Sequence, residues 1–185
     1  MYKFKSLGVF CGSASGVNPQ YVKDAAKLGG LLAKNGIRLI YGAGHVGMMG
    51  AVAKGALEAG GTVVGIINTL LQDREEQIFK LSELKILPSL HIRKDAMLEA
   101  SDAFCVLPGG IGTLDEIFEV MTLKQIGEHK KPIIMYNANG FWNPLKNVVD
   151  TLIGEGYVRP EHAKLLTYVD NVDDILPTID SEIAD

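Results

Sequence analysis

The chain has 185 residues, 47% of them apolar, and its 22 acidic side chains outnumber 18 basic ones to give a formal net charge of −4. This length fits a single domain over residues 1–185, and the lack of a basic excess argues against a nucleic-acid partner, so we expect a small-molecule ligand. No apolar run approaches the roughly 20 residues of a membrane span, and Cys11 and Cys105 form neither a disulfide framework nor a metal-ligand spacing, so we expect a cytoplasmic protein without a membrane partner.

The first predicted elements alternate between short apolar strands and helices. The strand at residues 7–11 ends in the glycine- and serine-rich loop 12–16, and a helix begins near Pro19, a residue suited to the first helical turn. The next strand, 37–41, ends in the loop Gly42-Ala43-Gly44-His45-Val46-Gly47, and another helix follows it. Each strand therefore leads through a glycine-rich loop into a helix.

The same alternation continues to the end of the chain. A third strand at 62–67 precedes the polar stretch 72–77, which is typical of a solvated helix face or a loop. The remaining strands are predicted at 84–87, 103–107, 132–136 and 165–168, and the helices at 89–100, from the Gly109 loop to Gly127, at 144–153 and from Val172.

This alternation predicts the fold class. Strands that alternate with helices of ten or more residues form a parallel sheet covered on both faces, so we expect a Rossmann-like, doubly wound α/β fold with three αβα layers in a single domain. Such sheets bind ligands outside the carboxyl ends of their strands, where all the glycine loops of this chain fall. The functional site is therefore expected at that edge.

The loop Pro108-Gly109-Gly110-Ile111-Gly112-Thr113 is the most informative of these loops. Three glycines within four residues let the backbone turn sharply and present its N–H groups, and the N-terminus of the following helix favours an anion. The loop therefore predicts a phosphate site. Glu116 is equally consistent with a Thr-x-x-Glu capping box, in which Thr113 and Glu116 bond each other's backbone amides.

The loop at residues 42–47 matches the G-x-G-x-x-G fingerprint of dinucleotide-binding proteins. That fingerprint also requires an acidic residue about 20 positions further on, which holds the ribose hydroxyls. The next strand here ends at Ile67-Asn68, without a carboxylate. A nicotinamide dehydrogenase is therefore disfavoured.

Arg93 and Lys94 lie in the predicted first turn of the helix at 89–100, where the helix dipole disfavours cations by roughly 0.3–1 kcal/mol each. For Lys94, a solvated side chain and a ligand contact both fit the pattern. A functional role fits Arg93 better, because its helix starts at the edge that carries the glycine loops and its guanidinium could grip an anionic ligand through two hydrogen bonds.

No pattern indicates a metal or a nucleophilic serine. His45 has no cysteine or carboxylate at ligand spacing, so no metal site is predicted. Ser13 and Ser15 lack the G-x-S-x-G elbow of serine hydrolases, which favours loop or anion-contact roles. The paired Met48 and Met49 are typical of core filling.

Two motifs together carry a family resemblance. Residues 108–116 read P-G-G-x-G-T-x-x-E, and Arg93-Lys94 follows His91. On these motifs, and over nearly its whole length, the chain resembles the LOG proteins, cytokinin-activating phosphoribohydrolases also described as possible lysine decarboxylases. Further similar segments are Cys11-Gly12-Ser13, Gly47-Met48-Met49-Gly50, Asn143-Pro144-Leu145 and Glu155-Gly156-Tyr157.

The resemblance implies an N-glycosyl hydrolase that cleaves adenosine 5′-monophosphates, including N6-modified ones, to the free base and ribose 5-phosphate, without a cofactor. Arg93 and Glu116 would be catalytic. The nucleotide would be bound by Glu75, Lys94, Gly109, Gly110, Ile111, Gly112, Thr113, Asp115 and Thr122, with Gly12, Ser13, Gly44 and Met49 from the other glycine loops. Ala43, Ile111 and Leu123 replace the Gly, Tyr and Trp that are usual in the family, so the preference between plain and N6-prenylated adenine stays open.

The residue types fit this chemistry. Breaking the bond builds positive charge on the ribose, which a fixed carboxylate such as Glu116 can stabilise while it activates water. Arg93 could hold phosphate or ribose oxygens, or assist the departing base. The main alternative is a non-catalytic carrier or sensor of a nucleotide-like cofactor on the same fold, and the joint presence of Arg93 and Glu116 favours the enzyme.

Two further expectations concern assembly and an older functional label. The helix after the Gly109 loop carries more apolar residues than one sheet-facing stripe requires, which together with the resemblance predicts a homodimer. These residues are Ile117, Phe118, Val120, Met121 and Leu123. A lysine decarboxylase would need pyridoxal phosphate on a Schiff-base lysine with an acidic partner for the ring nitrogen, for which the sequence gives no support.

Overall fold

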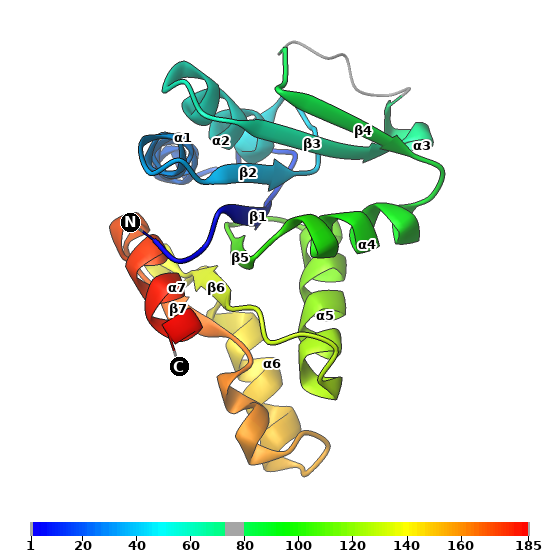
Figure 1. Cartoon of the computed structure of the whole chain (residues 1–185). Helices are drawn as coiled ribbons and strands as arrows, with labels where there is room; N and C mark the ends of the chain where they lie inside the picture. The colour runs from blue at the N-terminus through cyan, green and yellow to red at the C-terminus, as the bar shows by residue number, and fades with distance from the viewer. Residues whose placement is uncertain (1, 73–79, 185) are drawn as a thin grey trace.

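The computed structural model describes residues 2–72 and 80–184, and these residues form one seven-stranded parallel sheet between two layers of helices (Figure 1). The order across the sheet is β4-β3-β2-β1-β5-β6-β7, and every neighbouring pair is parallel. The predicted Rossmann-like, doubly wound fold is confirmed. The strands are β1 (Ser6–Phe10), β2 (Arg38–Tyr41), β3 (Val63–Asn68), β4 (Glu83–Leu87), β5 (Ala103–Val106), β6 (Ile133–Tyr136) and β7 (Thr167–Val169).

Helices cover both faces of this sheet. The core on one face joins the sheet to α1, α2 and α7, and the core on the other joins it to α4, α5 and α6. The strands β1, β3 and β5 are buried along their whole length, which explains their nearly continuous apolar composition. The helices are α1 (Pro19–Lys34), α2 (Gly47–Glu58), α3 (Thr69–Gln72), α4 (Leu90–Ala100), α5 (Ile111–Ile126), α6 (Asn143–Gly154) and α7 (Ile175–Ala184).

Most predicted boundaries are right to within one or two residues, and the C-terminal region also contains 3-10 turns that were not predicted. The strand predicted at 165–168 lies at Thr167–Val169, because Leu165 closes a short 3-10 helix, η2 (Pro160–Lys164), through a backbone bond to His162. The helix predicted from Val172 begins with another 3-10 turn, η3 (Val172–Asp174), and α7 starts only at Ile175. Apolar composition alone does not separate these turns from regular elements.

The chain reverses direction across the sheet at the β1/β5 junction. From β1 it proceeds outward to β4, and then returns through α4 to β5 on the other side of β1. The loops that leave the carboxyl ends of β1 and β5 therefore diverge to opposite faces, and a crevice opens between them. This is the topological switch point at which such sheets bind ligands.

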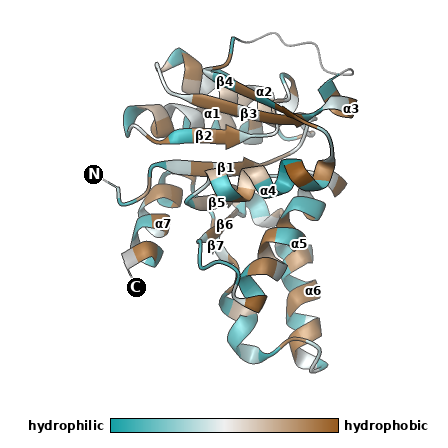
Figure 2. Ribbon diagram, turned by 45° about the vertical axis from the view of Figure 1, so that its right-hand side comes forward, coloured by the Kyte–Doolittle hydropathy of each residue, from teal (hydrophilic) through white to brown (hydrophobic). Residues whose placement is uncertain are grey.

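Several helices expose large apolar side chains, and α5 and α6 are among them. Figure 2 shows hydrophobic residues along both of them as well as in the strands. Phe118 and Ile126 on α5, and Val148 and Leu152 on α6, are exposed, although each helix also packs on the sheet. Among the described helices, none combines the length and apolar composition that a membrane span requires.

Candidate active site

Backbone contacts join three glycine loops at the carboxyl edge of the sheet. The amide of Gly12, after β1, donates to the carbonyl of Pro108, after β5, at 3.1 Å, and the amide of Met49 donates to the carbonyl of Gly12 at 3.3 Å. Gly109 makes the approach feasible, because a methyl carbon there would lie 2.9 Å from the amide nitrogen of Gly12. The loops after β1, β2 and β5 thus form one continuous surface.

The N-terminus of α5 presents free backbone amides to this surface. Gly110 is the N-cap residue and provides no side-chain hydrogen bond to the helix, and an added Cβ at Gly110 or Gly112 would meet nothing within 4 Å. The amides of Ile111, Gly112 and Thr113 therefore have no intrahelical acceptor and lie where an anion can reach them. The start of α5 is therefore open to an anion, and a phosphate at this position stays a prediction.

The proposed capping box between Thr113 and Glu116 is wrong. Since α5 begins at Ile111, Thr113 is already a buried residue of the first turn and not the capping residue. Glu116 lies one turn further along, and its carboxylate pairs with Arg93. The spacing from Thr113 to Glu116 would form a capping box only if Thr113 were the N-cap residue of α5.

Arg93 and Glu116 form a buried ion pair between α4 and α5. The Nη1 of Arg93 lies 3.0 Å from Oε1 of Glu116, and the two side chains are only 8% and 11% exposed. The Nε of Arg93 also donates to the carbonyl of Ile66, near the end of β3, at 2.9 Å. Two fixed bonds thus hold the guanidinium in place, and its remaining N–H donors can serve a ligand.

The surroundings of Glu116 change its acidity. Burial raises the pKa of its carboxyl group, and the nearby Asp115 carboxylate raises it further, whereas Arg93 and Lys94 act in the opposite direction. The net direction is upward from the ordinary value of 4.5. A carboxylate with a raised pKa is a better proton acceptor, which suits a general base.

Lys94 is neither solvated nor directed at the crevice. Its side chain is 11% exposed, and its Nζ pairs with Asp115 at 3.0 Å and with Glu119, both on α5. Although burial alone would lower it, hydrogen bonds to Glu119 and Asp115 raise the pKa of Lys94. Lys94 therefore fastens α4 to α5 beside the Arg93–Glu116 pair.

The crevice is a pocket of about 380 Å³, large enough for a nucleotide-sized ligand. Of the residues predicted for the site, it is lined by Gly12, Ser13, Met49, Arg93, Gly110, Ile111, Gly112, Thr113, Asp115 and Glu116. Four predicted residues do not line it: Lys94, Thr122, which is exposed on α5, and Gly44 and Gly109, which pack behind Met49 and Thr113. Glu75 lies outside the described residues.

Three further residues line the pocket that sequence reasoning did not assign to it: Cys11, Leu71 and Leu90. Cys11 directly follows β1 and precedes Gly12, so its position in the first loop was a usable signal. Its thiol is buried, and burial together with the nearby Glu116 carboxylate raises the pKa of Cys11 well above its ordinary value. Leu71 and Leu90 reach the pocket through the tertiary arrangement of α3 and α4, for which the sequence carries no local signal.

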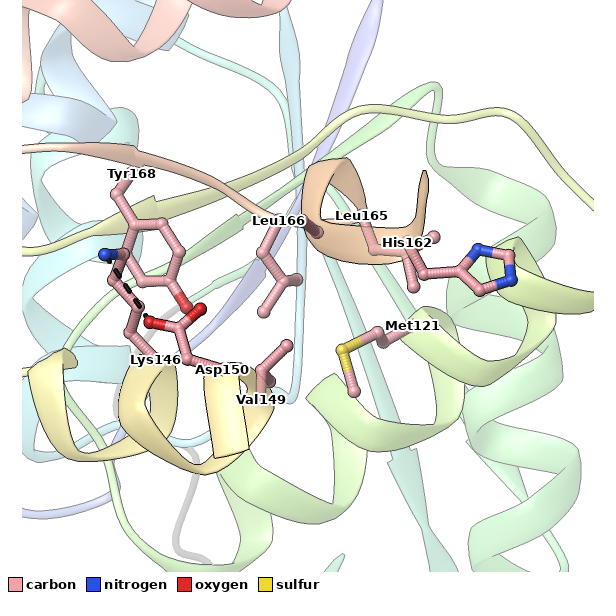
Figure 3. A pocket seen from close by; sticks show the side chains of 9 residues that line it. Met121, Lys146, Val149, Asp150, His162, Leu165, Leu166 and Tyr168 are labelled. Atoms are coloured by element: carbon pink, nitrogen blue, oxygen red, sulfur yellow. Dashed lines mark ion pairs between the residues drawn. The ribbon is translucent and has the colours of Figure 1, made fainter. Parts of the chain in front are cut away.

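A second pocket lies between α5, α6 and the segment from η2 to β7 (Figure 3). It is smaller, at about 80 Å³, and mainly apolar, and Lys146 and Asp150 form an ion pair of 3.7 Å at its rim. Burial and the Asp150 carboxylate raise the pKa of Tyr168 to about 12, so its phenol stays protonated. None of the predicted site residues lines this pocket.

Comparison with known proteins places the chain in a family. The model of the family described as "Possible lysine decarboxylase" matches residues 49–179. The chain is 38% identical over 174 residues to the cytokinin riboside 5′-monophosphate phosphoribohydrolase LOG7 of Arabidopsis thaliana, which covers 94% of this chain and 80% of that protein. The chain belongs to the LOG family. A bacterial LOG-family relative, the cytokinin riboside 5′-monophosphate phosphoribohydrolase of Rhodococcoides fascians, is 40% identical over 157 residues, 84% of this chain and 79% of that protein.

Solved structures share the LOG-family fold beyond recognisable sequence similarity. The molybdenum cofactor carrier protein of Chlamydomonas reinhardtii superposes with a TM-score of 0.75 over 98% of this chain and 99% of that one. Only 20% of the residues are identical, so this likeness concerns the fold alone. The fold therefore does not decide between an enzyme and a carrier, whereas the LOG-family membership favours the enzyme.

Proposed function

We propose that the protein hydrolyses the N-glycosidic bond of adenosine 5′-monophosphates, N6-substituted ones included, and releases the free base and ribose 5-phosphate. One observation carries the proposal: the buried Arg93–Glu116 pair lines the same pocket as the free amides at the N-terminus of α5. The N-terminal amides of α5 and the Glu116 carboxylate lie one helical turn apart, which would suit a ligand with a phosphate on one side of its ribose and a base on the other. The names of the LOG-family relatives support the same reaction.

The phosphate of the nucleotide would bind the amides of Ile111, Gly112 and Thr113. These groups combine directed N–H donors with the positive end of the α5 dipole, so they favour a dianion over a neutral hydroxyl. Gly12 and Ser13 also line the pocket and can add donors from the loop after β1. Binding of the phosphate would then place the ribose beside Glu116.

Glu116 would act on the ribose. As the bond between C1′ and the base breaks, its electron pair leaves with the base, and positive charge develops on the ribose ring. The Glu116 carboxylate stabilises this charge and accepts a proton from the water that attacks C1′. Transfer of that proton to the departed base, directly or through solvent, gives the neutral free base and restores the carboxylate. Arg93 keeps the carboxylate oriented through the 3.0 Å pair, and Arg93 also lines the pocket.

The apolar part of the pocket would receive the base. Met49, Leu71, Leu90 and Ile111 line it, and Ile111 is 82% exposed in the described structure. An N6-isopentenyl group placed on these side chains would remove apolar surface from water on both partners. We therefore expect N6-isopentenyl-AMP to have a lower KM than AMP.

The residues present do not suit the lysine decarboxylase implied by the family description. A pyridoxal phosphate enzyme needs a lysine in the pocket whose amine loses its proton readily. Among the described residues, no lysine lines the pocket, and Lys94 close by has a raised pKa and two carboxylate partners. The residues that line the pocket fit hydrolysis better than decarboxylation.

A cytoplasmic homodimer completes the proposal. Of the α5 residues on which the dimer prediction was based, Ile117 and Val120 pack in the core of one chain. Exposed apolar side chains remain at Phe118 and Ile126 on α5 and at Val148 and Leu152 on α6, and a second copy could cover them. Both cysteines are free and buried, as expected in a reducing compartment. Light scattering should give a particle of twice the 20.0 kDa chain mass, and a 20.0 kDa particle at micromolar concentration would contradict the dimer.

The deciding experiment separates the enzyme from a nucleotide carrier. The protein is incubated with AMP or N6-isopentenyl-AMP, and chromatography follows the free base and ribose 5-phosphate. The hydrolase produces both products in equal amounts over many turnovers. A carrier would bind the nucleotide, as seen by calorimetry, and leave it intact.

A further inference from the structure

The guanidinium of Arg93 lies directly against the backbone of Gly42, the first residue after β2. A methyl carbon at Gly42 would lie 2.5 Å from Nη2 of Arg93, and 3.1 Å from Sδ of Met49. The backbone of Gly42 is outside the left-handed region, so its conformation does not require glycine. The need for glycine at this position is therefore a need for space.

The Arg93 side chain has little freedom to give way. Its Nε is fixed to the carbonyl of Ile66 at 2.9 Å, and its Nη1 to Glu116 at 3.0 Å. The residue is 7% exposed, and its contacts come from β3, α5 and the loop after β2. Any atom added at Gly42 must push the guanidinium away, and that displacement lengthens at least one of the two bonds.

We propose that Gly42 is a positioning residue: its missing side chain forms the slot that holds the Arg93 guanidinium against Glu116 and toward the ligand. This inference deepens the proposed function and rests on it for its kinetic consequence. Gly42 does not line the ligand pocket, so it acts through Arg93 and not by contact with the nucleotide. An effect on turnover with little effect on binding follows from this arrangement.

The pKa of Glu116 gives a second measure of the Arg93 position, independent of the kinetics. The charged and titratable groups that face Glu116 are Arg93 and Lys94 from α4, Asp115 from its own helix, and Cys11 after β1. Arg93 is the one among them that Gly42 contacts, and it lowers the pKa of the carboxyl group. Displacement of the guanidinium should therefore raise the pKa of Glu116.

The test compares Gly42→Ala with Gly30→Ala. Gly30 lies in α1, where an added methyl carbon would meet nothing closer than 3.9 Å, so this variant should keep the kcat, the KM and the Glu116 pKa of the unchanged protein. Because alanine favours a helix more than glycine does, its melting temperature should be equal or higher. For Gly42→Ala we expect kcat on AMP to fall by about tenfold to a hundredfold with KM changed less than about threefold, because small misplacements of catalytic groups are costly. NMR of carbon-13-labelled glutamate should show a higher pKa for Glu116 than in the Gly30→Ala control.

A double-mutant cycle keeps the inference testable if Gly42→Ala is poorly stable. In an Arg93→Ala background the guanidinium is gone, so Gly42→Ala should lower the melting temperature much less than it does beside Arg93. The proposed role of Gly42 would be wrong if Gly42→Ala lowered the melting temperature equally in both backgrounds. It would also be wrong if Gly42→Ala left both kcat and the pKa of Glu116 unchanged. If the unchanged protein hydrolyses no nucleotide, the proposed function is wrong. The double-mutant cycle and the NMR titration still test whether Gly42 positions Arg93.

Discussion

Glu116→Gln separates the charge of this residue from its shape. A glutamine can still accept the hydrogen bond from Nη1 of Arg93, which lies 3.0 Å from Oε1 in a pair that is about nine-tenths buried. If the charge serves the developing ribose cation, kcat on AMP should fall by roughly 10²–10⁴, which corresponds to about 3–5 kcal/mol of lost transition-state stabilisation.

The same substitution also affects folding. Removing one partner of a buried ion pair costs roughly 3–5 kcal/mol, and the retained hydrogen bond should reduce this to about 1–3 kcal/mol. For a chain of this length, each kcal/mol lowers Tm by roughly 2–4 °C, so we expect a decrease of several degrees with the fold intact.

The assay measures kcat by chromatography of the free base, nucleotide affinity by calorimetry, and Tm by thermal unfolding. Glu99→Gln is the matched control, since it makes the same chemical change at an exposed position of α4 outside the pocket, and it should leave all three values unchanged. A Glu116→Gln protein with lowered Tm but near-normal kcat would mean that Glu116 serves only as the structural partner of Arg93.

Three further predictions concern pH, Lys94 and metals. Because burial raises the pKa of Glu116 and hydrolysis needs its deprotonated form, kcat should rise with pH through a midpoint above 4.5, and a midpoint at or below 4.5 would contradict the proposed base. Lys94→Met should leave the Asp115 and Glu119 carboxylates facing each other and destabilise the fold by about 1–2 kcal/mol in thermal unfolding, with a smaller loss at acidic pH; an unchanged Tm would refute its role between α4 and α5. Turnover should survive EDTA, since the described residues contain no group of three metal-ligating side chains, and restoration of lost activity by a divalent ion would reveal a missed site.

The fold was predictable because its signals are local. The strands β1, β2 and β5 are short apolar runs followed by glycine loops, and their order implies a parallel sheet whose carboxyl edge carries the site. Arg93 is a cation near the N-terminus of α4, where the helix dipole disfavours positive charge. Its hydrogen bonds to the Ile66 carbonyl and the Glu116 carboxylate compensate for this cost. The unfavourable position of the Arg93 charge in the sequence therefore helped to locate the pocket.

The partners of these residues were not predictable. Lys94 was predicted in the first turn of its helix together with Arg93 but is the fifth residue of α4. Its carboxylate partners lie 21 and 25 residues away on α5, and only the crossing of α4 and α5 brings them together. Leu71 and Gly42 likewise acquire their roles from neighbours distant in sequence. Thr122 was predicted to contribute to the site, but it does not line the pocket of a single chain and is exposed on α5.

The most direct test of the account is competition between AMP and adenosine in one reaction with the unchanged protein. The two substrates differ only in the phosphate, which the amides of Ile111, Gly112 and Thr113 would bind beside the Arg93–Glu116 pair. We predict that kcat/KM for AMP exceeds that for adenosine by roughly 10²-fold or more, as expected for several charge-assisted hydrogen bonds. The sugar products identify the substrate, and comparable rates of ribose 5-phosphate and ribose release would contradict the phosphate site and, with it, the proposed orientation of the nucleotide.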